Sequence, residues 1–367
     1  MTKPLVFITC IAIAIGCSTP PQAQESSLVS SIDSLLDLHT NFSGVVLAAD
    51  DGTIVYHQAR GFRDYRKQVP LDTIDIFELA SVSKQFTAMT IMMLKEEGKL
   101  SYDDSLGKYV PGLPYSGITI RHLLTHTSGL PDYQVVMDAH WDKSKVAGNP
   151  DIIEYLIQYQ PPMLFTPGSE YQYSNTGYVL LGSIAEAASG QDFADFCRER
   201  IFTPLSMSST DIRTNDEKKL LPNLALGHMF VEEEERFVHA DSFPSSNYTI
   251  WLGGRKGPGR VSATAIDLLK WDQALANHTL VSATSLEEAF TPATLNDGTK
   301  SNYGFGWMIR SDSAVGKVVL HTGDNPGYRT IILRYLDRNK TLIVLNNNDY
   351  DGIETVRREL EKILLAN

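Results

Sequence analysis

Residues 77–98, FELASVSKQFTAMTIMMLKEEG, are apolar or small at almost every position around Ser81 and Lys84. This pattern predicts a helix that is buried nearly all round. Ser81 and Lys84 are three residues apart, which puts them on one face near the start of that helix. A buried helix that carries a hydroxyl and an ammonium group there needs a reason for both.

A catalytic interpretation and a structural one both explain the pair. A serine hydroxyl becomes a good nucleophile when a neighbouring base takes its proton. Burial among Phe86, Met89 and Met93 would lower the pKa of Lys84 and make it such a base, and N–H groups at a helix start can hold an oxyanion. Alternatively, Ser81 or Ser83 caps the helix while Lys84 reaches water. The S-x-x-K motif alone does not separate the two.

Strand patterns occupy both ends of the chain and helical patterns the middle. Residues 43–61, SGVVLAADDGTIVYHQARG, predict two strands joined by an Asp-Asp-Gly turn. The stretches KVVLHTG, RTIILRYL and TLIVLNN predict three more, followed by a helix over residues 353–365. If these strands share one sheet, the two ends of the chain meet there. We therefore expect a mixed α/β (α+β) fold with an inserted, mainly helical lobe, and a site in the cleft between lobe and sheet.

This layout predicts a single domain over residues 26–367. Its sheet lobe would comprise about residues 26–76 and 301–367, and its helical lobe about residues 77–300. The chain has 367 residues, 43% hydrophobic, with a net charge of −12 and no cluster of Lys and Arg. Nucleic acid and anionic membrane surfaces are therefore not expected partners.

The N-terminus has the features of a targeting segment. Lys3 precedes a short apolar run, residues 5–16, which is too short to span a bilayer, where about 20 residues are needed. Gly16-Cys17 resembles a bacterial lipoprotein cleavage site with Cys17 as the lipidated residue, although simple cleavage near Ala23 is an alternative. We expect residues 1–25 to be a signal peptide and tether, and the protein to be exported to the periplasm or cell envelope on a lipid anchor.

Cysteine and histidine offer fewer candidates. If Cys17 is lipidated, only Cys197 remains for the mature fold, where a core thiol is expected and an intradomain disulfide is not possible. His122 and His126 are four residues apart, as zinc ligands on a helix would be. No Glu lies between them, and Ser128-Gly129 breaks the helix, so the pair is better interpreted as ordering a loop. No metal site is predicted.

Two downstream motifs could cooperate with Ser81 and Lys84. In FTPGSEYQYSNTGYVLLG, residues 165–182, Tyr173 could act as a general base or relay a proton, and Asn175 could orient a substrate amide. The alternative is a helix start capped by Ser174 or Asn175. In VVLHTGDNPGYRT, residues 318–330, a strand runs into His-Thr-Gly. A glycine there would let the backbone approach a ligand closely, and an edge strand can present N–H groups.

The order of the three motifs carries a family resemblance. S-x-x-K, then Y-x-N about 90 residues later, then H-T-G about 150 beyond it, resembles the serine β-lactamase and penicillin-binding protein superfamily. The flanking stretches TIRHLLTHTSGLPDY, PGSEYQYSNTGYVLLG and ATAIDLLKW resemble the class C β-lactamase-like serine hydrolases, which include β-lactamases, esterases, D-amino-acid peptidases and low-molecular-weight penicillin-binding proteins. The resemblance runs from about Ile32 to the C-terminus.

The resemblance implies a role for each motif. Ser81 would be the acylated nucleophile, Lys84 its proton acceptor or field source, and Tyr173 the partner base. The implied substrate-binding residues are Asn175, His321, Thr322, Gly323 and Asp324. The backbone N–H groups of Ser81 and Asp324 would form the oxyanion hole. The implied fold is an antiparallel sheet flanked by the terminal helices plus a helical lobe, and no metal or organic cofactor is implied.

The sequence departs from the β-lactamase pattern in two places. His321 stands where strong β-lactamases carry Lys, and His is largely neutral at pH 7. Arg329 could supply the missing charge, or it could simply face solvent from a strand. The stretch GPGRV has Gly259-Arg260 in place of the usual Gly-Gly, which alters one wall of the site.

These observations predict a serine hydrolase that acts through an acyl-enzyme on small esters or amides, including D-amino-acid or peptidoglycan-derived peptides. One alternative is a true class C-like β-lactamase with β-lactam substrates. The other is a penicillin- or peptide-binding sensor that is acylated without turnover.

Overall fold

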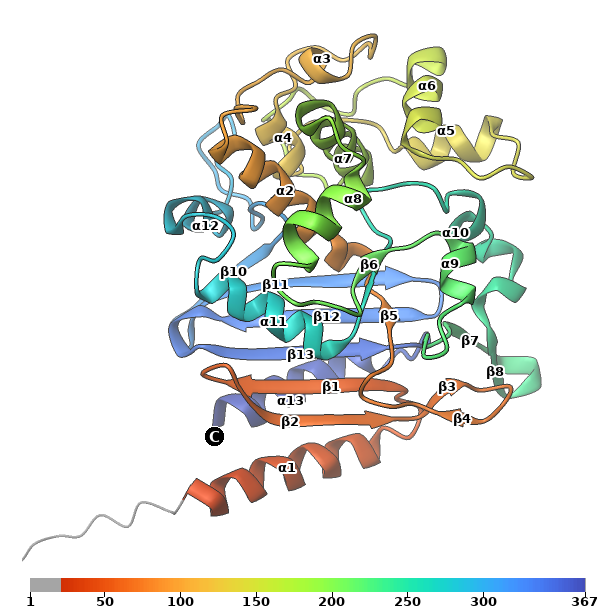
Figure 1. Cartoon of the computed structure of the whole chain (residues 1–367), viewed down its shortest axis with the longest axis vertical. Helices are drawn as coiled ribbons and strands as arrows, with labels where there is room; N and C mark the ends of the chain where they lie inside the picture. Colours follow the sequence, from red (N-terminus) through yellow and green to blue (C-terminus); the bar gives the residue numbers. More distant parts are fainter. Residues whose placement is uncertain (1–20, 367) are drawn as a thin grey trace, which may run out of the picture.

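The computed structural model describes residues 21–366 (Figure 1). Cys17 and most of the predicted signal peptide lie outside the described residues. The helix α1 includes residues 21–25, so the last residues predicted to belong to the tether are helical.

The elements follow the chain in the order expected. The helices are α1 (Pro21–Leu38), α2 (Lys84–Glu96), α3 (Leu106–Tyr109), α4 (Ile120–Leu124), α5 (Tyr133–His140), α6 (Asn149–Tyr159), α7 (Asn175–Ser189), α8 (Phe193–Cys197), α9 (Asn215–Lys219), α10 (Tyr248–Trp251), α11 (Ala265–Ala276), α12 (Ala283–Ala289) and α13 (Ile353–Ala366). The strands are β1 (Gly44–Asp50), β2 (Thr53–Arg60), β3 (Phe62–Asp64), β4 (Val69–Pro70), β5 (Phe77–Glu78), β6 (Asp211–Ile212), β7 (His228–Val231), β8 (Arg236–His239), β9 (Val261–Ala263), β10 (Met308–Asp312), β11 (Gly316–Asn325), β12 (Tyr328–Tyr335) and β13 (Lys340–Asn346).

The main sheet joins the two ends of the chain. Its strand order is β10-β11-β12-β13-β1-β2, and every neighbouring pair is antiparallel. Gly44 of β1 lies opposite Asn346 of β13, so strands about 300 residues apart in sequence are hydrogen-bonded neighbours. This confirms the expected sheet and the helical insertion between its two parts (Figure 1).

The sheet is buried on both faces because its central strands are apolar at consecutive positions. In β1, Val45 and Leu47 face the core shared with the helical lobe, whereas Val46 and Ala48 face the core shared with α1 and α13. Successive side chains of a strand point to opposite faces, so one apolar run serves two layers of helices. The helical lobe is thereby fixed on one face of the sheet.

The sheet has one strand more than the sequence predicted, β10, at the edge next to β11. The strand β10 pairs with β11 only as far as Leu320, so within the described chain residues 321–325 have a strand partner on the β12 side alone. This free edge packs against the turn Ala80–Ser83, which precedes α2. The geometry puts the third motif directly beside the first.

None of the helices formed by residues 21–366 is long and apolar enough to cross a membrane. The same residues contain no group of three or more His, Cys, Asp or Glu side chains placed to hold a metal ion. The single described cysteine, Cys197, is a buried free thiol whose pKa burial raises to about 12. It is the core thiol that the sequence predicted.

Candidate functional site

Ser81 lies in a 3₁₀ turn, Ala80–Ser83, and not at a helix cap. Ser83 precedes the first residue of α2 but makes no capping bond, because its hydroxyl instead accepts the Val261 N–H at 3.1 Å. Lys84 is completely buried. The alternative of a capping serine with Lys84 reaching water is therefore wrong.

Lys84 Nζ has three oxygen atoms around it. They are Ser81 Oγ at 3.0 Å, Asn175 Oδ1 at 2.8 Å and the Pro258 carbonyl oxygen at 2.9 Å. The last two oxygens can only accept hydrogen bonds. A neutral amine satisfies both with its two N–H groups, and its lone pair then faces the Ser81 hydroxyl. This arrangement suits a base that takes the Ser81 proton.

The surroundings of Lys84 favour its neutral form. Burial lowers the pKa of the Lys84 amine well below its usual value, and the positive charge of Arg255 acts in the same direction. Arg255 is itself buried and donates a hydrogen bond to Tyr133. A lysine that is shielded from solvent and lies near another cation loses its proton at a lower pH than an exposed lysine does.

Tyr173 lies with its ring over the same amine. Lys84 Nζ is 4.8 Å from the centroid of the Tyr173 ring. Desolvation raises the pKa of the Tyr173 phenol, although a hydrogen bond with Ser81 acts in the opposite direction. The phenol is therefore protonated at neutral pH, which fits the proton-relay role better than the partner-base role that the resemblance implied.

Asn175 is the first residue of α7, and the cap of that helix is Ser174, whose hydroxyl accepts the Gly177 N–H at 3.2 Å. Asn175 is therefore not needed as a cap. Its Oδ1 accepts from Lys84, so its amide N–H groups are the part that can meet a substrate carbonyl.

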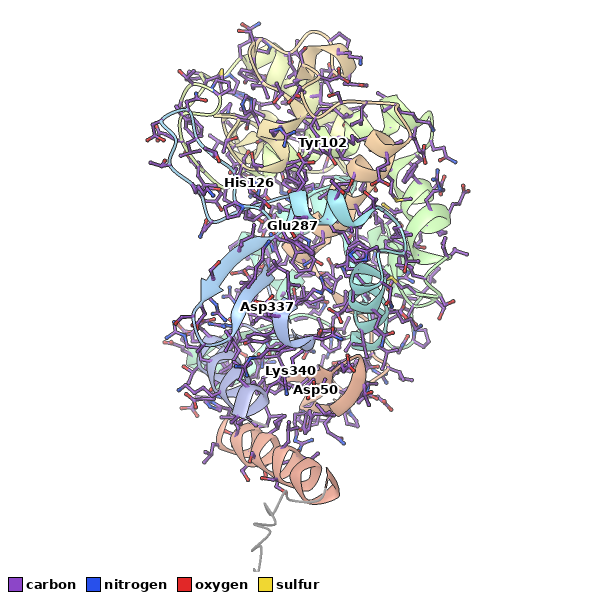
Figure 2. The ribbon with its side chains drawn as sticks, turned by 90° about the vertical axis from the view of Figure 1, so that its left-hand side faces the viewer. Asp50, Tyr102, His126, Glu287, Asp337 and Lys340 are labelled. Atoms are coloured by element: carbon purple, nitrogen blue, oxygen red, sulfur yellow. The ribbon has the colours of Figure 1, made fainter. Side chains whose placement is uncertain are left out.

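His126 holds this tyrosine and asparagine in place. Its Nδ1 accepts the Ser174 N–H at 3.0 Å, and its ring centroid is 4.3 Å from that of Tyr173. Figure 2 shows His126 in the helical lobe, on the side of the sheet away from α1. His122 similarly accepts the Thr119 N–H at 3.2 Å. Both imidazoles order backbone, as the loop interpretation expected.

His321 does not present a cation to the site. It is fully buried, Tyr303 Oη is 2.8 Å from its Nε2, and the Thr322 carbonyl oxygen is 2.6 Å from its Nδ1. A carbonyl only accepts, so Nδ1 carries the proton and Nε2 accepts from the tyrosine. Burial lowers the pKa of His321 to about 3, and Lys84 adds to this lowering whenever its amine is protonated.

His321 therefore does not supply a cation that could anchor an anionic substrate, because burial disfavours the charged imidazole throughout the physiological range. KM for an anionic substrate should not rise between pH 6 and 8 on account of this residue.

The remaining residues of β11 line the free edge. Asp324 is exposed and forms an ion pair with Arg329, directly opposite it on β12. The Arg329 charge is thus neutralised at the surface, which agrees with a solvent-facing strand arginine. Thr322 is half-buried, and its carbonyl is occupied by His321. The role of the Asp324 backbone N–H in an oxyanion hole stays a prediction.

Gly323 allows β11 to approach the Ser81 turn. A Cβ atom on Gly323 would lie 2.2 Å from the Leu79 carbonyl oxygen and 2.3 Å from Thr330 Oγ1. Those two groups are hydrogen-bonded to each other at 2.7 Å and join β12 to the turn. Neither can move without shifting backbone, so only glycine fits at this position.

We expect Gly323→Ala to lower kcat/KM by roughly 100-fold or more, which is the typical cost of losing one oxyanion donor. The added methyl group should push β11 and its N–H groups away from Ser81. Steady-state kinetics on any turned-over ester will measure this. Gly107→Ala is the control, since the nearest atom to its added Cβ would be 3.8 Å away. Equal activity of the two variants would contradict the close approach.

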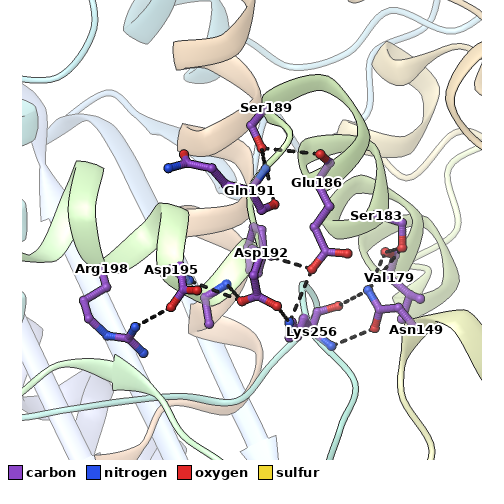
Figure 3. A network of polar contacts seen from close by, with 12 residues as sticks. Asn149, Val179, Ser183, Glu186, Ser189, Gln191, Asp192, Asp195, Arg198 and Lys256 are labelled. Atoms are coloured by element: carbon purple, nitrogen blue, oxygen red, sulfur yellow. Dashed lines mark hydrogen bonds and ion pairs between the residues drawn. The ribbon is translucent and has the colours of Figure 1, made fainter.

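The Pro258 carbonyl owes its position to contacts outside the site. Residues 254–258 are held against α6 and α7, where the Asn149 side chain accepts the Lys256 N–H at 2.8 Å and donates to the Lys256 carbonyl at 3.1 Å (Figure 3). The Lys256 ammonium pairs with Asp192 and, at 3.3 Å, with Glu186. The adjoining Gly257 carbonyl accepts from Thr87 of α2 at 2.7 Å.

Asn149→Ala should lower the free energy of unfolding by about 2 kcal/mol, because it leaves two buried peptide groups without partners. It should also lower kcat, since the Pro258 carbonyl would no longer be fixed beside Lys84. Denaturant unfolding and kinetics measure the two effects. Ser183→Ala removes a 3.3 Å contact of the same side chain and a long 3.4 Å bond to the Val179 carbonyl oxygen within α7, and it should change neither. An unchanged kcat in a destabilised Asn149→Ala protein would contradict the link to Lys84.

Comparisons with known proteins match nearly the whole described chain. A family model described as beta-lactamase matches residues 32–366. Penicillin-binding protein 4* of Bacillus subtilis (strain 168) is 42% identical over 333 residues, which cover 90% of this chain and 73% of that protein. A D-aminopeptidase of Gluconobacter oxydans (strain 621H) is 26% identical over 306 residues, covering 83% of this chain and 55% of that protein.

The fold comparison agrees. The solved structure of a penicillin-binding protein from Bacillus halodurans has a TM-score of 0.78 and 27% identity, covering 90% of this chain and 98% of that one. The family match includes every residue of the candidate site except Cys17.

Proposed function

The chain belongs to the beta-lactamase family of serine hydrolases, and on that premise we propose that it cleaves small esters and amides through an acyl-enzyme on Ser81. The observation that carries the proposal is the set of three oxygens around Lys84 Nζ. A neutral amine donates its two N–H groups to the two carbonyl oxygens, so toward the Ser81 hydroxyl it can act only as a proton acceptor.

In the first step, Ser81 Oγ attacks the substrate carbonyl carbon while Lys84 Nζ takes its proton. Negative charge collects on the carbonyl oxygen, where the N–H groups of Ser81 and Asp324 would hold it. The bond to the leaving group then breaks, and the proton passes from Lys84 through Tyr173 to the leaving atom. Ser81 is now an ester and Lys84 is neutral again.

Water completes the reaction. It attacks the acyl-enzyme carbonyl and loses a proton to Lys84 Nζ, either directly or through the Tyr173 hydroxyl. Lys84 then returns the proton to Ser81 Oγ as the bond to the acyl carbon breaks and the acid product leaves. The protonated resting Tyr173 supports this order of events, because a phenol can donate as soon as Lys84 is charged.

We propose small peptide amides and esters, D-amino acid derivatives among them, as substrates. A β-lactam carries a carboxylate that needs an anchor on the leaving-group side. Neither His321 nor Arg329 offers an unpaired cation there, since the first is buried and neutral and the second is paired with Asp324. The similarity to a D-aminopeptidase supports the same substrate class.

A substrate panel tests this choice on protein that lacks residues 1–20 and so keeps α1 whole. A chromogenic ester and a D-alanyl anilide should be hydrolysed, with kcat/KM for a chromogenic cephalosporin lower by roughly 10- to 100-fold for want of a charged anchor. Faster cephalosporin turnover would favour the β-lactamase alternative. Stoichiometric labelling by a fluorescent penicillin with no turnover of any substrate would favour the sensor.

We also propose export and lipid anchoring through Cys17, supported by Lys3, the apolar run over residues 5–16 and the Gly16-Cys17 pair. Radiolabelled palmitate should enter the wild-type protein in a bacterial host and not the Cys17→Ala variant. Label in both proteins, or in neither, would contradict the anchor.

A further inference from the structure

A cavity of about 430 Å³ opens beside the Ser81 turn. Its wall includes Glu78, which lies just before that turn, and Asn325, the last residue of β11. Arg260 and Tyr328 are also part of this wall. The cavity therefore begins where the candidate reaction centre ends.

Arg260 occupies this wall in an unusual state. It is only 4% exposed, and its φ of +84° is in the region that side chains other than glycine rarely adopt. Neighbouring Gly259 is close to the Ser81 turn, since a Cβ there would lie 3.7 Å from the Ala80 carbonyl oxygen. Backbone strain of this kind concentrates at ligand sites, where the surrounding structure maintains it.

The guanidinium of Arg260 is poorly satisfied by the protein. It donates to Asn215 Oδ1 at 2.5 Å, but its contacts to the Thr249 and Arg213 carbonyls are long, at 3.4 Å each. Its Nε has no partner among the described residues. All the oxygens it reaches are neutral, and arginine stays charged even when buried.

The other cations of the cavity wall each have a carboxylate partner. The pairs are Lys218 with Glu78, Arg63 with Asp75, Lys67 with Asp64 and Lys219 with Asp216. Within residues 21–366, Arg260 has no carboxylate oxygen within 4.0 Å; Asp241 and Glu78, which is bonded to Lys218, act on it only through space. A buried cation without a directly bonded counter-ion is costly, and an anionic ligand would relieve that cost.

The cavity and Tyr173 lie at different points along the same strand edge, so they would receive different parts of a substrate. Tyr173, which delivers the proton to the leaving group, lies beside His321, with 6.2 Å between their ring centroids. The cavity starts at Asn325, four residues further along the same strand edge. If the substrate carbonyl is held between Ser81 and Asp324, as the proposed mechanism has it, a leaving group directed toward Tyr173 would place the acyl group on the side of the cavity.

We propose that Arg260 binds a carboxylate carried by the acyl part of the substrate, so that the enzyme prefers acyl groups with a terminal acid. This inference rests on the proposed function, because the acyl side is defined by attack from Ser81. The Arg260 guanidinium keeps one unpaired N–H on Nε and a second on Nη1. A charge-assisted hydrogen bond from such a group to a carboxylate is one of the strong ones.

The test compares two p-nitrophenyl esters that differ only at the far end of the acyl chain, a valerate with a methyl group and a glutarate with a carboxylate. The wild-type full chain should prefer the glutarate in kcat/KM by roughly 10- to 100-fold, as expected for a charged hydrogen-bonded contact. Arg260→Gly and Arg260→Gln should lose that preference, mainly through KM, while valerate hydrolysis changes less than about threefold.

Three features keep the test decisive. Arg260→Gly suits the positive φ, so the loss of the guanidinium does not add backbone strain. Lys219→Gln removes an exposed charge from the same wall and should keep the preference. Thermal unfolding of all variants shows that they are folded.

Two results would overturn the proposal: no glutarate preference in the wild type, or an equal loss for both esters in the Arg260 variants. A second readout separates it from the proposed function. Calorimetry of glutarate binding to Ser81→Ala protein, with and without Arg260→Gly, needs no turnover. If neither ester is hydrolysed but glutarate binds only when Arg260 is present, the hydrolase mechanism fails and the anion site stands.

Discussion

Ser81→Ala is expected to abolish turnover of every substrate and all labelling by a fluorophosphonate. Removing the nucleophile of a serine hydrolase typically costs roughly 10⁶-fold in kcat, because no other group can form the covalent intermediate. The change removes one hydroxyl from a half-buried turn, so the fold should be retained. Activity on a chromogenic ester, a labelled gel and a thermal unfolding curve together give the result.

Ser83→Ala is the matched control. Ser83 lies in the same turn, but its hydroxyl accepts from the Val261 N–H rather than from Lys84. It should lose some stability, about 1 kcal/mol for one buried hydrogen bond, and keep labelling. Undiminished turnover in Ser81→Ala, or loss of labelling in Ser83→Ala alone, would move the nucleophile elsewhere.

Lys84→Met should lower kcat/KM by roughly 10⁴-fold and leave a folded protein, because methionine fills a similar apolar space without the amine. The wild-type rate should follow the ionisation of the same group. Only neutral Lys84 has a lone pair, so kcat/KM should be highest above its lowered pKa and fall as pH drops through that value. This fall in kcat/KM, the acidic limb of the pH profile, should appear at a pH well below the usual lysine pKa, because burial and the charge of Arg255 both lower the pKa of Lys84.

Lys95→Met, near the other end of α2, serves as control and should change neither rate nor pH limb. A wild-type rate that keeps rising up to the ordinary lysine pKa would mean that Lys84 is not held neutral. A Lys84→Met protein with the normal acidic limb would assign that limb to another residue.

The sequence was sufficient to predict the sheet, because strand patterns at both chain ends are local signals that need no tertiary information. The pairing of Ser81 with Lys84 was predicted from the order of the three motifs, since S-x-x-K alone also allowed a capping serine. Strand β10 was missed because MIRSD is short, with three of its five residues at least partly exposed and polar. The early start of α1 was missed because a proline-containing stretch was interpreted as a tether.

The hydrogen-bond partners and the burial of several site residues could not be predicted, because they depend on contacts between residues far apart in the sequence. Any residue has a carbonyl, so nothing marked Pro258 as the third partner of Lys84. The full burial of His321 could not be predicted from the pattern, because the Tyr303 that encloses it is 18 residues away. The Arg260 substitution was visible in GPGRV, but its unpaired guanidinium appears only once Asn215 and Thr249 are placed beside it.

The central claim is a covalent acyl group on Ser81, and mass spectrometry tests it most directly. The purified protein is mixed with the p-nitrophenyl valerate ester, quenched in acid within the first turnover and digested. The account predicts that the valeryl group is found on the peptide that contains Ser81, and that Ser81→Ala protein carries none. A valeryl group on a different residue that forms and decays at the rate of turnover would contradict it.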